Sequence, residues 1–477
     1  MKMLPTLIVD LDGTLISTDS LIESAILLIK KNPLYFFLIV FWATKGRAHL
    51  KAEIASRVVL DVDSLPYHLP FLEWLNGQKI EGRQIFLVTA AHHTIAAEVS
   101  KKIQIFDGVF ASDQFHNLKG ETKLKKIKDI FGGDFVYAGN SRADLPIWLA
   151  AKSAVMVNVP PRLAAEVRKE VVVEKEFAPA KIGLRTWLRA LRVHQWVKNS
   201  LLFVPLLTAF EFFEIYKVGY MILAFFSYSM VASATYILND IWDLKSDRLH
   251  SRKCLRPFAS GKISILHGLG IAGLLLILAF VVAQFISISF VYILMTYLLL
   301  TSVYSLFFKE YVVIDILMLS CLYTLRIIAG AIVIDVAMSP WLLEFSMFLF
   351  LSLALIKRCA ELVSIEKLVE TSVVSGRDYK VADLVVLWPL GVGASLSAIV
   401  VFGLFISAPQ TQMRYATPEL LWAVAIGIIY WLGRMWIKTS RGEMHDDPIV
   451  YVIKDRISYL VLCSTIVVTL VAYFYTI

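Results

Sequence analysis

Hydrophobic and polar positions follow two different patterns along the chain, and the change between them falls near residue 198. Before that point, short apolar runs alternate with stretches of helical spacing. The runs at 7–12, 85–90 and 135–140 are typical of buried parallel strands, and the run at 155–159 fits the edge of the same sheet. The pattern predicts an α/β domain over residues 1–157.

Three further segments, one within this domain and two after it, have distinct patterns. Residues 20–80 are helical in pattern and predict a cap; within them 33–43 is apolar but too short to cross a bilayer of about 30 Å. We expect a buried cap helix there, with a helix that dips into the membrane as the alternative. Residues 158–184 are charged and contain three prolines, which predicts a linker. The mixture of Trp, Leu, Arg and Lys at 184–199 suits a helix in the cytoplasmic headgroup layer.

After residue 198, most apolar segments are long enough to cross a bilayer. They predict an all-α membrane bundle over residues 185–477, with about nine transmembrane helices. The expected segments are 200–212, 218–239, 264–286, 288–308, 311–334, 340–357, 383–407, 419–438 and 457–477.

Charge predicts the orientation of this bundle. If the first domain is cytoplasmic, the loops on its side carry 16 Lys and Arg residues, whereas the opposite side carries two, Lys217 and Arg414. The excess of positive charge on one side predicts a multi-pass integral membrane protein with its first domain and active sites in the cytoplasm. The C-terminus is then outside, and the acidic residues at 10 and 12 argue against a signal peptide.

The amino-acid composition limits the classes of molecule that the chain is expected to bind. The chain is 58% apolar and 18% charged, with a formal net charge of +8. Without a long basic tract or an RNA-binding signature, this charge favours anionic lipid or a phosphate-rich substrate, and we expect no nucleic acid partner. The four cysteines have neither metal-ligand nor disulfide spacing, which fits a reducing or membrane-buried setting.

A first group of polar residues follows the strands of the α/β domain. Asp10, Asp12 and Thr14 close the first run, Thr89 ends the second, and Asn140 and Asp144 follow the third. The carboxyl ends of parallel strands form one edge of a sheet. One carboxylate there can attack phosphorus while the other moves a proton, and Mg²⁺ offsets the repulsion between carboxylates and phosphate.

These motifs resemble the haloacid dehalogenase superfamily over about residues 5–160, a Rossmann-like fold with a cap. The resemblance implies phosphatase (hydrolase) activity with Asp10 as nucleophile, Asp12 as acid and base, Thr89 as the phosphate-orienting hydroxyl and Asp144 as a magnesium ligand beside Asp10 and Asp12. The superfamily's lysine is Lys119 or Lys123; we prefer Lys123 for its apolar spacing to Ile127 and Ile130. Asn140 stands where the superfamily usually has Asp. A degenerate domain kept for docking is therefore the alternative.

A second group of polar residues follows the second predicted span. Asn239, Asp243 and Asp247 are spaced by four, which places them on one helical face with Asp240 beside them. Like charges at this spacing repel, so the array makes sense where divalent cations bridge it to a diphosphate. The basic residues that follow are suited to phosphate oxygens: Arg248, Arg252, Lys253, Arg256 and Lys262.

The NDxxDxxxD spacing resembles the UbiA superfamily of intramembrane prenyltransferases, over about residues 185–477. Most members carry a second aspartate-rich motif, where this chain has only Asp315, followed by Arg326 and Gly330. With the segments QWVKN, KRCAEL and DP…KDRIS, the chain looks like the decaprenyl-phosphate phosphoribosyltransferase subgroup, although Val193 replaces a usual Pro. The implied metal ligands are Asn239, Asp240, Asp243 and Asp247. The implied substrate-binding residues are Lys198, Arg248, Lys253, Arg256, Tyr304, Lys309, Asp315, Lys357 and Arg358.

The implied reaction moves 5-phosphoribose from phosphoribosyl diphosphate to a polyprenyl phosphate in the membrane, with Mg²⁺ as cofactor. The fused domain would then dephosphorylate the lipid-linked product. The alternative is a prenyltransferase that joins a prenyl diphosphate to an aromatic or other acceptor. A transporter would place its polar groups near the bilayer midplane between inverted repeats, and neither feature is found in the sequence.

Overall fold

The computed structural model describes residues 4–250, 252–366, 378–444 and 447–475 of the chain. The chain divides into two compact units. Unit 1 comprises residues 1–190 and 237–270, and unit 2 comprises residues 191–236 and 271–477. Parts of the predicted cytoplasmic loops (251, 367–377 and 445–446) and the end of the last predicted span (476–477) lie outside the described residues.

A parallel sheet is the centre of unit 1. Its described strands are ordered β3-β2-β1-β4-β5-β6, and every neighbouring pair is parallel. Apolar side chains alternate between its two faces, because Leu7 and Val9 belong to one core cluster and Ile8 to the other. The strands are β1 (Thr6–Val9), β2 (Ile85–His92), β3 (Gly108–Ser112), β4 (Phe135–Gly139), β5 (Ser153–Val157) and β6 (Val173–Phe177).

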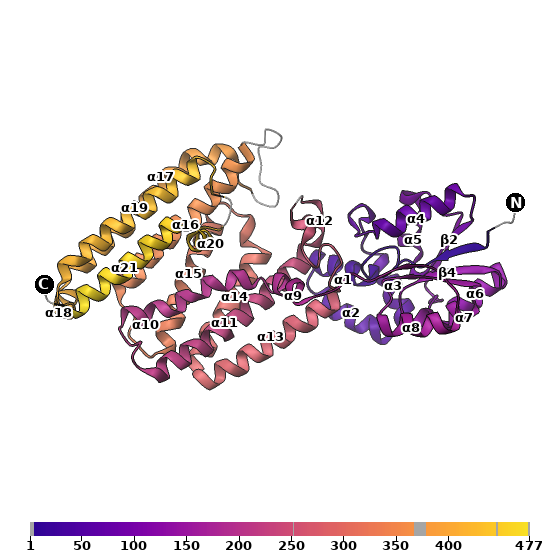
Figure 1. Cartoon of the computed structure of the whole chain (residues 1–477), viewed down its shortest axis with the longest axis horizontal. Coiled ribbons are helices and arrows are strands. Elements are labelled where there is room, and N and C mark those ends of the chain that lie inside the picture. Colours follow the sequence, from indigo (N-terminus) through magenta and orange to yellow (C-terminus); the bar gives the residue numbers. More distant parts are fainter. Residues whose placement is uncertain (1–3, 251, 367–377, 445–446, 476–477) are drawn as a thin grey trace. The chain divides into compact units, whose positions relative to one another are not determined.

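Helices cover both faces of this sheet, as Figure 1 shows. Residues of α4 (Leu69–Ile80) and α5 (His93–Ile103) pack on one face. Residues of three helices pack on the other: α6 (Glu121–Phe131), α7 (Leu145–Ala150) and α8 (Pro161–Glu170). The predicted α/β fold class is therefore confirmed.

Two details of the predicted domain differ from the structure. The expected linker contains α8 and β6, and β6 pairs with β5, so the sheet continues to Phe177. The run at 155–159 is consequently not at the edge but lies between β4 and β6. Charge concealed these elements, since β6 (VEKEF) is an edge strand whose Glu and Lys side chains are exposed.

The cap, predicted over residues 20–80, is shorter in the structure, because α4 packs on the sheet. Three helices form it: α1 (Ser20–Lys31), α2 (Tyr35–Thr44) and α3 (Arg47–Ala55). Leu28, Trp42 and Ile54 make their small core. The expectation that 33–43 is a buried helix is wrong, because most apolar side chains of α2 are exposed. Apolar composition alone cannot distinguish a helix buried in a protein core from a helix whose apolar side chains lie on the protein surface.

Unit 2 is helical, and its helices pack around two main clusters of buried apolar residues. One cluster joins α15 (Ile314–Val333), α16 (Pro340–Glu366), α17 (Leu384–Ser407) and α19 (Leu421–Ser440). The other joins η3 (Val193–Phe203) and α10 (Val204–Thr208) to α11 (Ile215–Trp242), α13 (Ile265–Ile286), α14 (Ile288–Leu306) and α15. The described part of unit 2 also contains α18 (Pro409–Arg414), α20 (Pro448–Lys454) and α21 (Arg456–Phe474).

In the described part of the chain, seven helices are long and apolar enough to cross a membrane: α11, α13, α14, α15, α17, α19 and α21. An integral membrane protein is therefore confirmed, while the count of nine is approximate. The predicted span at 340–357 lies in α16, a helix of 27 residues with many buried positions. The predicted span at 200–212 is not one helix; it is shared between the end of η3 and the short α10.

Candidate active sites

The polar residues predicted in the α/β domain gather at the carboxyl ends of β1, β2 and β4. Asp10 directly follows the central strand β1, and its backbone N–H donates to the carbonyl of Ala138 in β4. The chain order reverses between β1 and β4, which is where open α/β sheets bind ligands. The strands thus present Asp10, Thr89 and Asp144 at one rim.

A lysine lies directly against the first of these carboxylates. Lys123 Nζ of α6 is 2.8 Å from Asp10 Oδ1 and 2.7 Å from the hydroxyl of Tyr137. The Tyr137 hydroxyl donates in turn to Asp144 Oδ1 at 2.8 Å. The structure places Lys123 against the predicted nucleophile, whereas Lys119 lies before α6 begins. Tyr137, which the motif did not indicate, connects the two ends of this network.

Burial governs the charge of both motif carboxylates. Desolvation raises the pKa of Asp10, and the ammonium of Lys123 partly opposes this increase. Desolvation, together with the negative charge of Asp19, raises the pKa of Asp12 to about 7. Asp12 accepts hydrogen bonds from the backbone N–H of Ser20 at 2.9 Å and from its hydroxyl at 3.1 Å. A carboxyl group with such a pKa can hold and release a proton near neutrality.

Backbone and amide groups hold the rest of the rim. Asp144 Oδ2 accepts hydrogen bonds from the backbone N–H groups of Asn140 and Ser141. A Cβ at Gly13, whose φ is +77°, would stand 2.0 Å from Asn140 Nδ2, so the amide packs against the turn of the first motif. Thr89 is fully buried, and its hydroxyl accepts from the backbone N–H of Ala91 at 3.0 Å. The unusual Asn140 therefore lies beside the carboxylates.

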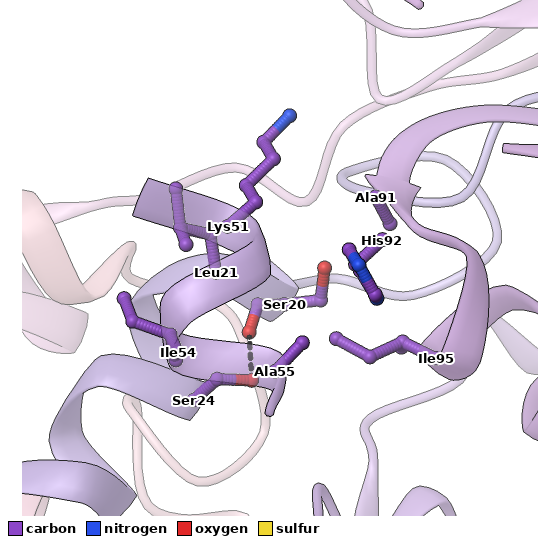
Figure 2. Close-up of a pocket in the computed structure, with 9 residues that line it drawn as sticks. All are labelled: Ser20, Leu21, Ser24, Lys51, Ile54, Ala55, Ala91, His92 and Ile95. Atoms are coloured by element: carbon purple, nitrogen blue, oxygen red, sulfur yellow. Dashed lines mark hydrogen bonds between the residues drawn. The ribbon is translucent and has the colours of Figure 1, made fainter. Parts of the chain in front are cut away.

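A small pocket opens between the cap and the sheet next to Asp12. Figure 2 shows its lining, in which Ser20 and Ser24 of α1 face His92 and Ile95 across the opening. Its volume is about 10 Å³, which is room for about one water molecule. Lys51 of α3 closes one side and donates to the carbonyl of Ala90 and to Asn117. The cap thus lies directly over the rim of the sheet that holds the predicted site residues.

The second predicted group lies where α11 gives way to α12 (Leu244–Leu249). The helical register continues through this change, since Asp243 N–H donates to the carbonyl of Asn239, and Asp247 N–H donates to that of Asp243. Asp240 and Asp247 are both buried. Arg256 Nη1 lies between them, 3.1 Å from Asp240 Oδ1 and 2.6 Å from Asp247 Oδ2. The two carboxylates thus already enclose a cation.

The other basic residues of this segment have different surroundings. Arg248 forms a paired contact with Glu23 of α1, at 2.8 and 2.7 Å, and also donates to the carbonyl of Ala259. Lys245 pairs with Asp61 at 3.0 Å. Lys253 is exposed in η4 (Lys253–Leu255). The cap of the α/β domain and the aspartate segment are therefore joined within unit 1, and Arg248 has a carboxylate partner where we expected a substrate phosphate.

Unit 2 gathers two of the predicted lysines around an aspartate. Lys198 Nζ is 2.6 Å from Asp447 Oδ2 and Lys357 Nζ is 3.3 Å from the same atom. Desolvation lowers the pKa of Lys198 to about 8, although Asp447 opposes this decrease; the two lysines hold the pKa of Asp447 far below its usual range. Asp447 is the first residue of the DP…KDRIS segment, but only the fold shows that it binds both lysines.

Asp315 and Arg358, both predicted to bind substrate, face each other in unit 2. Both side chains are fully buried and form an ion pair, and Asp315 Oδ1 also accepts from the Tyr379 hydroxyl at 2.5 Å. Arg358 pairs with Glu361 as well. These contacts favour a structural role for Asp315 and Arg358. Tyr304 and Lys309 are half-buried at the end of α14 and in η5 (Phe308–Glu310).

Arg326 is buried in a polar contact with η3. Its Nε donates to Asn199 Oδ1 at 2.9 Å, and Nη2 donates to the Tyr297 hydroxyl at 3.1 Å. This arrangement requires α15 to approach η3 closely. A Cβ on Gly330 would stand 2.0 Å from the carbonyl oxygen of Leu202. Gly330 therefore permits the approach, and the arginine is satisfied inside the bundle, as its position in a predicted span required.

The predicted metal ligands do not form closed cages. Within the described ranges, no three or more His, Cys, Asp or Glu side chains group together as a metal site. Mg²⁺ is usually held by one or two carboxylates together with waters and substrate phosphates, so it does not need such a cage. Asp240 and Asp247 fit this requirement, because they are hard oxygen ligands that already bind one cationic group.

Comparison with known proteins identifies the second half of the chain. The model of the UbiA prenyltransferase family matches residues 200–475. The chain belongs to this family. A relative, the uncharacterised protein y4nM of Sinorhizobium fredii, is 37% identical over 95% of this chain and 88% of its own length. Decaprenyl-phosphate phosphoribosyltransferase of Mycolicibacterium smegmatis is 29% identical, over 48% of this chain and 72% of its own length.

Solved structures resemble each half. A UbiA homolog from Archaeoglobus fulgidus bound to GPP and Mg²⁺ has a TM-score of 0.45 and 17% identity, covering 59% of this chain and 99% of that one. A substrate-bound phosphoserine phosphatase has a TM-score of 0.28 and 16% identity, covering 40% of this chain and 99% of that one. The chain is a UbiA-family membrane protein with an α/β domain in front of its membrane helices.

Proposed function

We propose that the membrane domain transfers 5-phosphoribose from phosphoribosyl diphosphate to a polyprenyl phosphate. The observation that carries this proposal is the pair Asp240 and Asp247. Both carboxylates bind the guanidinium of Arg256, and a basic segment follows them directly in the chain. The relatives named decaprenyl-phosphate phosphoribosyltransferase support it, as does the single Asp315 in place of a second acidic cluster. An ordinary prenyltransferase would share the first motif but need that second cluster.

In this mechanism the chain's own residues bind and orient the leaving group. Asn239, Asp240, Asp243 and Asp247 provide oxygen ligands for Mg²⁺, which neutralises the diphosphate when bound. Lys253 and Lys309 are suited to phosphate oxygens, and Lys198 and Lys357 provide positive charge in unit 2. An oxygen of the acceptor phosphate attacks the anomeric carbon of the ribose. At the same time, the bond between that carbon and the diphosphate oxygen breaks. Positive charge develops on the sugar, and diphosphate leaves.

The test is incorporation of labelled phosphoribose into lipid by the full-length protein in nanodiscs. Phosphoribosyl diphosphate, Mg²⁺ and a series of polyprenyl phosphates are supplied together. We expect a labelled lipid with the wild type and about a hundredfold less with Asp243→Asn. Ser246→Ala is the matched control, since this exposed hydroxyl in the same segment donates only to a backbone carbonyl. No labelled lipid with any acceptor, but turnover of a prenyl diphosphate, would favour the prenyltransferase.

We also propose that the α/β domain hydrolyses the 5-phosphate that the transferred sugar still carries. Asp10 attacks the phosphorus, Asp12 gives its proton to the departing ribose oxygen, and water then releases phosphate from the aspartyl intermediate. Lys123, 2.8 Å from Asp10, offsets the negative charge of nucleophile and phosphate. Because both domains are parts of one chain, the second reaction takes place at a high effective concentration of its substrate.

Lipid products separate this role from a docking role. With Asp10→Asn, the phosphorylated lipid should accumulate while transfer continues. The matched control is Asp134→Asn, an exposed aspartate of the same domain that pairs with Lys152. An unchanged ratio of phosphorylated to dephosphorylated lipid in the Asp10 variant would show that the domain does not act on this product.

A further inference from the structure

The helix α2 has no polar face. Its sequence is YFFLIVFWAT, and its ten residues are about 15 Å long, half the thickness of a bilayer core. One side of α2 packs on the cap through Trp42, Tyr35 and Ile39. A cap helix in water would carry polar residues on its other side. Here the other side is apolar too.

The outer side of α2 exposes six large apolar residues together. Each is 42–69% exposed, and all come from one segment of eight residues: Leu34, Phe36, Phe37, Leu38, Val40 and Phe41. Single exposed apolar residues are ordinary, but a continuous patch of this kind marks a surface that binds something apolar. The helix is too short to cross a membrane and too apolar to face water.

Charges on both sides of the patch indicate what binds it. Lys30 and Lys31 precede α2, Lys45 and Arg47 follow it, and residues 24–52 contain no acidic residue. Lys45 Nζ is 4.8 Å from the ring centre of Phe41. An apolar helix between basic residues suits an anionic lipid surface, because the side chains enter the acyl region while the ammonium groups remain among headgroups.

A contact within unit 1 connects α2 to the membrane. Lys30, at the end of α1 and four residues before Leu34, lies 5.4 Å from the ring centre of Trp242. Trp242 is the last residue of α11, one of the helices long enough to cross a membrane. Tryptophan at the end of such a helix is typical of the membrane–water interface. The start of α2 is therefore attached to a point at that interface.

We propose that α2 inserts into one leaflet of the bilayer and anchors the α/β domain to the lipid surface. The occupant of its apolar side is lipid, not a second protein chain. The inference does not depend on which phosphate ester the domain hydrolyses. It gives the cap a second task, because the helices that cover the catalytic rim also hold that rim at the membrane.

The test is photocrosslinking from α2 in the full-length protein. Phe37 is replaced by p-benzoylphenylalanine, the protein is placed in nanodiscs containing anionic lipid, and adducts are identified by mass spectrometry. Phe36 is replaced in a second variant in case the first is poorly folded. The control position is Ile80, which is 87% exposed at the end of α4 and precedes β2, so it lies at the sheet edge opposite the catalytic rim.

We expect lipid adducts at positions 37 and 36 to exceed those at position 80 by about tenfold or more. Hydrolysis of p-nitrophenyl phosphate, compared with the wild type, reports whether each variant is folded. Lipid adducts no more frequent at 37 and 36 than at 80 would overturn the proposal. Adducts mainly to another protein chain would do so as well, and would assign the patch to a protein interface.

Discussion

The two regions of this chain that we propose to bind phosphate hold their carboxylates in different ways. In the α/β domain, Asp10 sits at the end of a buried strand with its lysine already 2.8 Å away. In the aspartate segment, Asp240 lies near the end of α11 and Asp247 lies in α12, and both bind Arg256. A sheet edge fixes its residues through the core, whereas a helix near the membrane relies on the charges it binds. The first site should thus be sensitive to its own residues and the second to the cations that enter it.

The largest effect should come from Asp10, the proposed nucleophile. Asp10→Asn removes the attacking oxygen charge, so hydrolysis of p-nitrophenyl phosphate should fall on the order of 10⁴-fold. Asp134→Asn should leave the rate within about twofold, since its ion pair is exposed. Transfer measured in parallel should be unaffected by either change. A loss of transfer in the Asp10 variant would mean that the two regions are not separable.

The next largest effect concerns stability in the bundle. Arg358→Met leaves the fully buried Asp315 without its cation, which should lower the free energy of unfolding by about 3–5 kcal/mol. Thermal unfolding in detergent measures this change. The control is Arg434→Met, because the Arg434–Asp455 pair is less buried and its loss should lower the free energy of unfolding by a smaller amount. Normal stability with weakened substrate binding would instead assign Arg358 to a substrate.

A moderate effect should follow from the aspartate segment. Asp247→Asn removes one of the charges that hold Arg256, so transfer should fall about a hundredfold and require more Mg²⁺. The rate measured against Mg²⁺ concentration checks both parts. Phosphatase activity on p-nitrophenyl phosphate serves as the internal control. A loss that no Mg²⁺ concentration reduces, with normal phosphatase activity, would contradict the role of this carboxylate in metal binding.

The smallest effect should appear where the two regions touch. Glu23→Gln weakens the paired contact with Arg248, and a freed Arg248 can reach a substrate phosphate. The KM for phosphoribosyl diphosphate should change by about threefold to tenfold with a similar kcat. Lys245→Gln, which loses only the exposed pair with Asp61, should change it by less than about twofold. Equal KM values in both variants would show that Glu23 does not restrain Arg248.

The sequence predicted what depends on local pattern. The buried strands, the placement of Asp10 and Asp12 at the end of the first strand, and the four-residue spacing at 239–247 are properties of neighbouring residues. Each lies in the expected type of element. Side-chain contacts between residues far apart in the sequence could not be predicted from these patterns. Tyr137 joins Lys123 to Asp144, Glu23 binds Arg248, and Asp447 binds two lysines, over separations that no periodicity records.

The errors have one physical origin, which is that composition does not specify surroundings. The charged segment after residue 160 contains β6, since an edge strand can expose charged side chains. The apolar segment at 33–43 was expected to be buried, since apolar residues gather wherever water is absent. The same limit applies to Asp315 and Arg358, which stay predicted substrate-binding residues: the sequence did not indicate that they pair with each other.

Gly330 carries a constraint of a different kind. Because a Cβ there would collide with the Leu202 carbonyl, even alanine at this position would push α15 away from η3. The displaced helix would carry Arg326 away from Asn199 and strand a guanidinium in apolar surroundings. Because the Leu202 contact is made by its backbone, related sequences should tolerate other side chains at position 202 more readily than any side chain at position 330. The hydrogen atom that serves as the side chain of Gly330 sets how closely the two backbones can approach.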